Sequence, residues 1–233
     1  MDMRKIGILG GVGPQATSFI YRSIIEQATE KGAVNNNDYP YVVVASVPVP
    51  DFISDKANIP KAKEMLVEAA RGLVESGCEI LCIGSNTAHI LLEDIAKDVQ
   101  TPFLSMVELV AKECDKRGFK KVALLGTPVL IESGLYNDEL GKHDIELITP
   151  NEDQEAVCDE VIRCIIGGKS IDEVKEQYVA VLNSMFSLGA EAIILGCTEL
   201  PMVLNYEALG NRIISSDELL AKGIVDYFYA ANN

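Results

Sequence analysis

The chain has 233 residues, and its 20 Lys and Arg against 35 Asp and Glu give a formal net charge of −15. That acidic balance argues against a nucleic-acid-binding protein, because such a protein needs a basic surface for the phosphates. With 48% hydrophobic residues the chain can bury a core, so disorder is excluded for the chain as a whole. No apolar run reaches the ~18 to 20 residues of a membrane-spanning helix, and the N-terminus lacks a secretory pattern. We therefore expect a cytoplasmic protein of one large or two small domains.

Six cysteines and two histidines limit the metal and redox chemistry. The cysteines lack the density of a disulfide scaffold and no pair has zinc-ribbon spacing, which predicts reduced thiols and no metal site. Five cysteines fall within predicted strands or helices, or beside them, and are expected to be packing residues: Cys78, Cys82, Cys114, Cys158 and Cys164.

Short β-branched runs alternate with longer stretches of helical periodicity, which is typical of βαβ units and a mainly parallel sheet. The predicted strands are 5–10, 41–47, 79–84, 121–126, 145–148, 192–196 and 212–214. The predicted helices are 15–31, 61–76, 89–98, 107–117, 154–166, 171–188 and 216–230. The last helix begins at Ser-Ser-Asp-Glu, a favourable N-cap with acids in the first turn.

An internal repeat is the most informative feature of the chain. Residues 77–85 (GCEILCIGS) align without gaps on 189–197 (GAEAIILGC) at an offset of 112, and residues 4–11 match 120–127 at an offset of 116. Chance similarity between buried strands is common, but two matched pairs in the same order favour duplication. We predict two pseudo-symmetric Rossmann-like α/β domains, residues 1–105 with 210–233 and residues 106–209. Since open α/β sheets bind ligands at the carboxyl ends of their strands, Ser85 and Cys197 are expected to be counterparts across one cleft.

The first glycine cluster follows a predicted strand and matches G-x-G-x-x-G/A through Gly11, Gly13 and Ala16. A dinucleotide site is disfavoured, because the second strand runs into Ser46 and prolines without an acid at its end. A more general interpretation is that backbone N–H groups at this turn hold a small anion such as a carboxylate. A tight βα turn without a ligand is the third possibility.

Two further clusters follow strands. Ser85, Asn86 and Thr87 supply a hydroxyl, an amide and an N-cap, and the same residues suit a purely capping role. Cys197 ends a strand before a helix N-terminus, where thiolate is favoured over thiol, so it is the best nucleophile or base candidate. Thr127 follows the equivalent strand of the second half and could bind a carboxylate or serve as a plain N-cap.

These motifs, in this order and spacing, resemble the aspartate/glutamate racemase family. The segments ILGGVGPQAT, SNTAH and ILGCTELP look like that family's GGMGPxAT, CNTAH and GCTE motifs, and the likeness covers nearly the whole chain. The resemblance implies two α/β domains with the active site in the cleft between them, commonly a homodimer, and racemisation by two opposed cysteines without pyridoxal phosphate or another cofactor. It also implies contacts with a small amino-acid substrate, from Val12, Asn86, Thr87, Thr127 and Thr198.

The chemistry explains why such enzymes use a pair of groups. An amino-acid Cα–H is a very weak acid, so a base on one face removes the proton while an acid on the other face returns it. Two thiols can exchange these roles, and nearby amides would stabilise the enolate-like charge.

This sequence departs from the family at the first catalytic cysteine, which is Ser85 here. A serine hydroxyl is too weak an acid and base to match a thiol, and no adjacent histidine activates it. Three interpretations follow: an engineered Cys→Ser variant of a normal racemase, a natural variant with one thiol, or a one-base reaction such as that of the related arylmalonate decarboxylases.

A second departure concerns the substrate side chain. Aspartate racemases often carry an Arg after P-x-P-D, whereas Phe52 follows Asp51 here, so Lys56 or Lys169 would have to supply the cation. Aspartate is the first expectation, with glutamate or another small amino acid open. The alternatives are a related one-cysteine decarboxylase or isomerase and a non-catalytic carboxylate-binding protein.

Overall fold

The structure is a computed structural model that describes residues 4–53, 55–197, 199–200, 203 and 207–230. It divides into two compact units, Met1–Met106 with Asp217–Asn233 and Val107–Ser216. The predicted domain boundaries were 105/106 and 209/210. The second boundary falls later in the structure because the strand that ends at Ser215 pairs within the second sheet. Among the described helices, none combines the length and apolar composition that crossing a bilayer requires.

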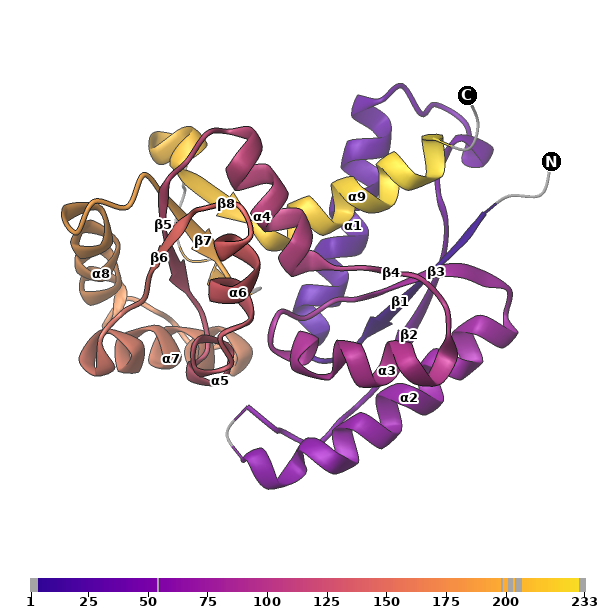
Figure 1. The fold of residues 1–233 in the computed structure, drawn as a ribbon, viewed down its shortest axis with the longest axis horizontal. Helices are drawn as coiled ribbons and strands as arrows, with labels where there is room; N and C mark the ends of the chain where they lie inside the picture. The colour runs from indigo at the N-terminus through magenta and orange to yellow at the C-terminus, as the bar shows by residue number, and fades with distance from the viewer. Residues whose placement is uncertain (1–3, 54, 198, 201–202, 204–206, 231–233) are drawn as a thin grey trace. The chain divides into compact units, whose positions relative to one another are not determined.

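The described part of the first unit contains a four-stranded sheet in the order β2-β1-β3-β4, and each neighbouring pair of strands is parallel (Figure 1). Its strands are β1 (Lys5–Gly10), β2 (Tyr41–Ser46), β3 (Cys78–Ile83) and β4 (Phe103–Leu104). Its helices are α1 (Pro14–Glu30), α2 (Ile59–Glu75), α3 (Leu92–Val99) and α9 (Ser216–Ala230), with the 3₁₀ segments η1 (Asn36–Asp38), η2 (Lys56–Asn58) and η3 (Thr87–Leu91).

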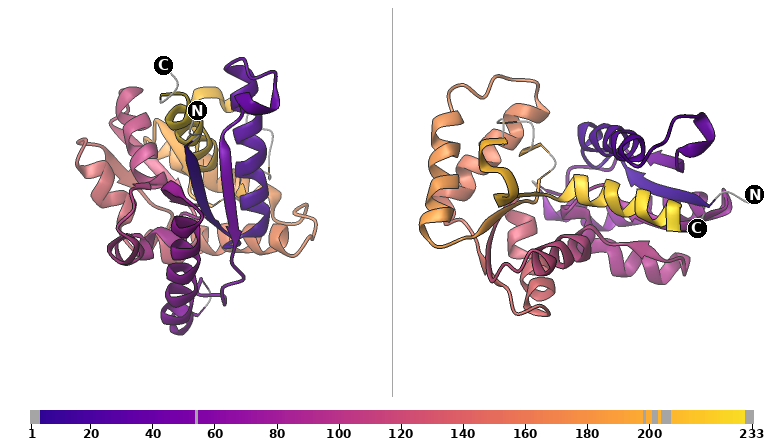
Figure 2. Two further views of the ribbon diagram at one scale, coloured as in Figure 1. Left: turned by 90° about the vertical axis from the view of Figure 1, so that its right-hand side faces the viewer. Right: turned by 90° about the horizontal axis from the view of Figure 1, so that it is seen from above.

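Helices cover both faces of this first sheet. Leu9 of β1 and Ile83 of β3 pack with Leu66 of α2 in a buried cluster that also includes residues of α3. The opposite face carries α1 and α9, which are joined by a 2.9 Å hydrogen bond from Gln27 Nε2 to the Glu218 carbonyl (Figure 2). The sheet is therefore buried in its centre, and the strand β2 lies at one edge.

The second unit repeats this design with a sheet in the order β6-β5-β7-β8, again parallel throughout its described strands. Its strands are β5 (Lys121–Leu125), β6 (Glu146–Ile148), β7 (Ala192–Leu195) and β8 (Ile213–Ser215). Its helices are α4 (Met106–Lys116), α5 (Pro128–Glu132), α6 (Leu135–Gly141), α7 (Glu152–Ile166) and α8 (Lys175–Ser187), with the 3₁₀ segment η5 (Glu207–Arg212). One face of the sheet packs on α7 and α8, through Val161, Tyr178 and Met185 against Leu125 and Leu195, and α4 and α6 lie on the other side (Figure 2).

The two units share one further detail that positions their strand ends. The Gly84 N–H donates to the Leu9 carbonyl at 2.9 Å, and the Gly196 N–H donates to the Leu125 carbonyl at 2.7 Å. Gly84 and Gly196 are equivalent in the sequence repeat, and so are Leu9 and Leu125. The predicted α/β class with mainly parallel sheets is confirmed.

The predicted helices and strands are all present, β1 and α9 with the predicted bounds and the others with shifted ends, while the short strand β4 and the short helices α5 and α6 were not predicted. The strand β4 has two residues, too few to give an alternating pattern. The helices α5 and α6 are separated at Gly134, which has a φ of 73°. That left-handed residue breaks the helical periodicity on which the prediction depended.

Candidate active site

The first cluster of predicted site residues lies immediately after β3. Ser85, Asn86 and Thr87 are all buried, and the Ser85 side chain is 6% exposed. The Ala88 N–H donates to Ser85 Oγ at 3.4 Å, so the hydroxyl contacts the first turn of η3, whose N-cap residue is Asn86. The hydrogen bond of Gly84 to β1 ends the sheet ladder one residue earlier, so position 85 is the first that is free of the sheet.

His89 holds the backbone of this cluster. Its Nε2 accepts a 3.0 Å hydrogen bond from the Met106 N–H. A nitrogen that accepts a bond from an amide carries a lone pair, so the ring is neutral and its proton lies on Nδ1. Nδ1 therefore donates to the Ser85 carbonyl, 2.7 Å away.

The glycine cluster at the end of β1 is shaped by packing within the unit. The Gly11 N–H donates to Thr17 Oγ1 at 3.0 Å, and the Thr17 hydroxyl lies 3.3 Å from the Gly13 carbonyl. Gly11 has a φ of 85°, and a Cβ on it would lie 2.4 Å from the Val47 amide nitrogen. The glycine is therefore required by the adjacent chain, whether or not a ligand binds. The Val12 side chain is buried in the same core, so a contact with substrate would have to come from its backbone.

The second cluster lies after β7 and contains a thiol–carboxylate pair. Cys197 Sγ donates to Glu199 Oε2 at 3.0 Å, and the two residues are 8% and 3% exposed. The Leu200 N–H donates to the Cys197 carbonyl at 3.1 Å, a turn that brings the two side chains together. Gly196, just before the cluster, packs closely on the neighbouring strand, because a Cβ on it would lie 2.6 Å from Leu124 Cδ1. The arrangement suits proton transfer, because a sulfur acid lies in contact with a carboxylate that can accept its proton.

The predicted threonines of the second unit have different outcomes. Thr127 is 1% exposed, and its Oγ1 accepts from the Leu130 N–H at 3.3 Å. It is therefore the N-cap of α5. Thr198 lies outside the described residues.

The remaining cysteines have the environments of packing residues. Burial raises the pKa of Cys114 and of Cys158 to about 12, and desolvation also raises the pKa of Cys78 and of Cys82. Their thiols therefore stay protonated at neutral pH. Cys164 is only partly buried.

The two candidate cations are both on exposed segments. Lys56 is exposed in η2, and Lys169 is exposed after the end of α7. Phe52, which follows Asp51 in the P-x-P-D segment, is 1% exposed and belongs to the core of the first unit. That position therefore contributes apolar packing and no positive charge.

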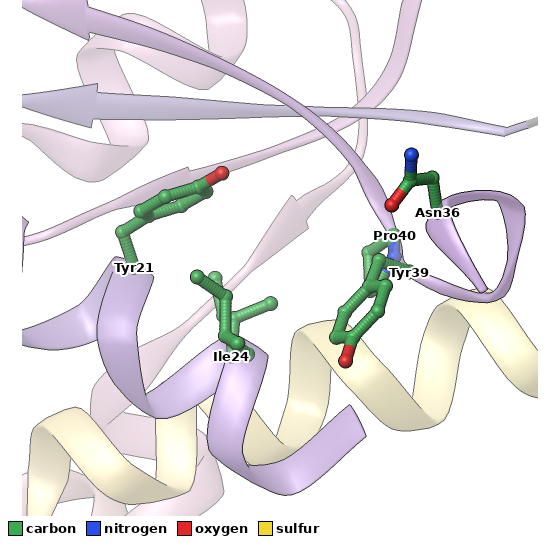
Figure 3. A pocket seen from close by; sticks show the side chains of 6 residues that line it. Tyr21, Ile24, Asn36, Tyr39 and Pro40 are labelled. Carbon is green, nitrogen blue, oxygen red and sulfur yellow. The ribbon is translucent and has the colours of Figure 1, made fainter. Parts of the chain in front are cut away.

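A pocket in the first unit lies away from these residues. It has a volume of about 280 Å³ and is lined by Tyr21, Ile24, Ile25, Asn36, Tyr39 and Pro40. Figure 3 shows side chains from α1 and from the segment before β2 around it. None of the predicted site residues lines it, so we assign it no catalytic role.

Comparison with known proteins identifies the family. The sequence model of the Asp/Glu/Hydantoin racemase family matches residues 9–222. The chain belongs to this racemase family. This racemase is 30% identical to the broad specificity amino-acid racemase RacX of Bacillus subtilis, over 97% of this chain and 98% of that protein.

Solved structures of racemases and their homologues are similar to this chain over nearly its whole length. An aspartate racemase homologue from Pyrococcus horikoshii OT3 matches with a TM-score of 0.81 and 29% identity, over 97% of this chain and 100% of that one. The aspartate racemase of Picrophilus torridus matches with a TM-score of 0.81 and 27% identity, over 97% and 94% of the two chains. The protein is therefore an enzyme of the racemase class, an isomerase.

Sequence reasoning about the racemase missed two residues of these clusters, Glu199 and His89. Both residues belong to the motifs on which the family resemblance is based, GCTE for Glu199 and SNTAH for His89. Their partners are a thiol two residues away and a backbone amide 17 residues away. In the described residues, no group of three or more His, Cys, Asp or Glu side chains is placed to hold a metal ion.

Proposed function

We propose that this racemase exchanges the Cα proton of a small amino acid, with aspartate as the first candidate substrate and glutamate as the second. The proposal is carried by the buried hydrogen bond between Cys197 and Glu199, 3.0 Å long, in a chain of the racemase family. The names of RacX and of the Picrophilus torridus enzyme support an amino-acid substrate. The proposed reaction uses no cofactor.

Cys197 is the proposed acid/base. Its thiol proton passes to the Glu199 carboxylate, and the resulting thiolate removes the Cα proton from one face of the bound amino acid. The electron pair of the broken C–H bond is delocalised into the substrate carboxylate, and hydrogen-bond donors stabilise that enolate-like charge. If the same thiol returns a proton to the same face, the substrate exchanges its hydrogen with solvent and keeps its configuration.

Inversion needs a second group on the opposite face, and position 85 is the proposed place for it. The Ser85 hydroxyl is occupied as the acceptor of the Ala88 N–H, and a hydroxyl is a poor proton donor and acceptor beside a thiol. We therefore expect the chain with Ser85 to exchange without efficient inversion. A cysteine at this position would complete a two-base pair with Cys197.

The substrate carboxylates are proposed to be held by donors near the two strand ends, among them the backbone at Val12 and the polar groups of Asn86, Thr87, Thr127 and Thr198. The distal carboxylate of aspartate also favours a cation. Phe52 supplies none, so Lys56 and Lys169 are the candidates for this contact. Loss of acidic-substrate preference in a Lys56→Ala or Lys169→Ala variant would identify the one that acts.

We propose that the enzyme is a homodimer joined through the face formed by α1 and β2, which we call the α1–β2 face. The β2 strand is an edge of its sheet and contains neither Lys nor Pro, the usual protection of such an edge. Large apolar side chains on and beside it are exposed: Tyr21 49%, Ile25 39%, Val34 82%, Tyr41 42% and Val44 40%.

The charges on α1 suit pairing with a second copy. Arg22 and Glu26 are one helical turn apart, 3.4 Å from each other and both exposed. If two α1 helices meet antiparallel about a two-fold axis midway between Arg22 and Glu26, Arg22 lies opposite Glu26 of the partner subunit, and the reverse contact forms at the same time. Such an interface is complementary to itself.

The test of the proposed activity is a Cα-deuterium exchange screen in D₂O over the common amino acids, with product configuration measured by chiral chromatography. It is run on this protein, on Ser85→Cys and on Cys197→Ala. We expect exchange in the first two and none in Cys197→Ala. Exchange that survives Cys197→Ala contradicts the mechanism, and binding without exchange in Ser85→Cys supports a non-catalytic carboxylate-binding protein instead.

Malonates and maleate complete the screen. Decarboxylation of a malonate or isomerisation of maleate, in the absence of amino-acid exchange, would support the related one-cysteine decarboxylase or isomerase.

A further inference from the structure

We propose that His89 is a positioning residue, which sets the backbone geometry of position 85 from a buried site that does not contact substrate. The inference rests on the proposed function only through the role given to position 85. Its basis is one side chain with two backbone partners in separate segments of the first unit.

The first step is the state of the ring. His89 is 4% exposed, and its two nitrogens are engaged by the Ser85 carbonyl at 2.7 Å and the Met106 N–H at 3.0 Å. The amide can only donate, so Nε2 accepts and Nδ1 donates. A neutral imidazole in a single tautomer satisfies both contacts, and neither a second tautomer nor the imidazolium can.

The second step is the effect on position 85. The Ser85 carbonyl belongs to the peptide plane between residues 85 and 86, so a bond to it fixes the orientation of that plane. The plane in turn sets the direction of the side chain at position 85 and of the N–H of Asn86. The local turn also contributes, since the His89 N–H donates to the Asn86 carbonyl at 3.0 Å.

The third step is the anchor at the other nitrogen. Met106 is the first residue of α4 and the last residue of the first unit, so the chain enters the second unit directly after the amide that His89 holds. The ring therefore links the strand-end cluster of the first unit to the point where the chain leaves that unit. Position 85 would shift if this anchor were released.

Two conservative variants separate the two contacts. The side-chain nitrogen of Asn reaches the place of imidazole Nδ1, and the side-chain oxygen of Gln reaches the place of Nε2. His89→Asn therefore keeps a donor for the Ser85 carbonyl, and His89→Gln keeps an acceptor for the Met106 N–H. His89→Phe fills the space and keeps neither. Leu91→Ala is the control, because Leu91 is buried in the same 3₁₀ segment and loses packing alone.

The experiment is done in the Ser85→Cys background, where the introduced thiol reports on its own geometry. Rates of iodoacetamide alkylation are measured by peptide mass spectrometry for that thiol and for Cys197 in the same sample, beside kcat, KM and Tm. We expect His89→Phe to raise the alkylation rate at position 85 several-fold and to leave the Cys197 rate unchanged. We expect kcat to fall about a hundredfold with KM little changed, because a misplacement of about 1 Å can cost that much.

The order among the variants decides the proposal. His89→Asn should stay closer to the parent than His89→Gln in both alkylation rate and kcat, whatever their relative Tm. If both quantities instead follow Tm across all four variants, with Leu91→Ala on the same line, His89 is only a core residue and the proposal is overturned. If Ser85→Cys does not racemise any amino acid, the proposed function fails while the alkylation rates still decide the role of His89.

Discussion

The Cys197 thiol donates a hydrogen bond to the Glu199 carboxylate across 3.0 Å, and both residues are buried. A carboxylate can take the thiol proton during the reaction, whereas an amide of the same shape cannot. We expect Glu199→Gln to lower kcat for Cα exchange by about 10²-fold or more, the usual contribution of a positioned acid or base. KM should change much less, because the amide preserves the shape of the pair.

The measurement is the rate of deuterium exchange at the substrate Cα, in steady state. Glu160→Gln serves as a control for removing one negative charge from the same unit, since Glu160 is exposed on α7. Equal kcat values in Glu199→Gln and in the unchanged protein would remove Glu199 from the mechanism.

Ser85→Cys should convert retention into inversion. With Ser85, we expect one enantiomer of the substrate to incorporate deuterium at Cα faster than it is converted to the other enantiomer. With a second thiol, the two rates should approach each other, as in a two-base reaction. Chiral separation of the deuterated products gives both rates. A Ser85→Cys protein that still exchanges with retention would argue for a one-base enzyme.

The same substitution should have a small effect on stability. The Ser85 hydroxyl accepts a 3.4 Å bond from the Ala88 N–H in the first turn of η3, and sulfur is a weaker acceptor. Loss of a side-chain bond to an N–H at a helix start costs about 1 kcal/mol, and a long bond lies at the low end of the range. Thermal unfolding of the two proteins should therefore differ by only a few degrees.

The duplicated fold was predictable because equivalent strands of the two units have similar local sequences. Gly84 and Gly196 are equivalent in the repeat. The Gly84 N–H donates to the Leu9 carbonyl, and the Gly196 N–H donates to the Leu125 carbonyl, which is the equivalent acceptor. The two sheets have the same strand order. The domain boundary near residue 216 was harder to predict from the sequence, because the three residues of β8 do not indicate which sheet the strand joins. That choice depends on pairing with β7, which is a tertiary contact.

The site was predictable by residue type and less so by contact. Cys197 stood out in the sequence because it ends a buried strand. Its partner Glu199 did not, since a Glu next to a Leu is equally compatible with an exposed turn. Thr127 Oγ1 accepts from the Leu130 N–H as an N-cap, and its contact with a substrate stays a prediction. Hydrogen-bond partners of this kind are set by the packed chain and leave no periodic signal.

Acid should weaken one specific contact in the second unit. The Lys120 and Lys121 N–H groups donate to Glu191 Oε2 at 2.5 and 3.0 Å, and these bonds lower the pKa of the carboxyl. A carboxyl with a lowered folded pKa stabilises the fold above its unfolded pKa, and that stabilisation is lost as pH falls through the folded value. We expect Glu191→Gln to lower Tm at pH 7 and the difference to shrink below about pH 4.

The matched control is Glu79→Gln, at the equivalent position of the first unit. The Glu79 side chain makes no hydrogen bond or ion pair within the described part of the chain. Its substitution should leave Tm unchanged at both pH values. A constant difference for Glu191→Gln across the range would mean that its charge is not the cause.

The α1–β2 face predicts a variant that separates the subunits. Ile25→Glu puts a charge at the centre of the proposed interface, where burial of an unpaired carboxylate is costly. Sedimentation equilibrium should give a dimer for the unchanged protein and a monomer for Ile25→Glu. Leu188→Glu, at a residue that is 55% exposed in the second unit, should remain dimeric. Identical masses for all three proteins would place any subunit contact elsewhere.

The glycine turn after β1 gives the largest expected loss of stability. Ala at Gly11 must adopt a φ near 85° and would place its Cβ 2.4 and 2.5 Å from the backbone nitrogen and oxygen of Val47, which cannot move aside as a flexible side chain can. Gly32 has a φ of 97° but nothing within 4 Å of its Cβ position, so Gly32→Ala isolates the cost of the backbone conformation.

We expect Gly32→Ala to cost about 1 to 2 kcal/mol, the usual penalty for a left-handed residue. Gly11→Ala should cost more than about 4 kcal/mol, because a backbone clash is added to the same strain. Urea unfolding of the two variants measures both values. If the two variants lose equal stability, packing against Val47 does not explain the glycine, and a ligand-binding reason for it regains weight. The comparison is clean because both residues lie in the first unit and neither substitution changes a charge.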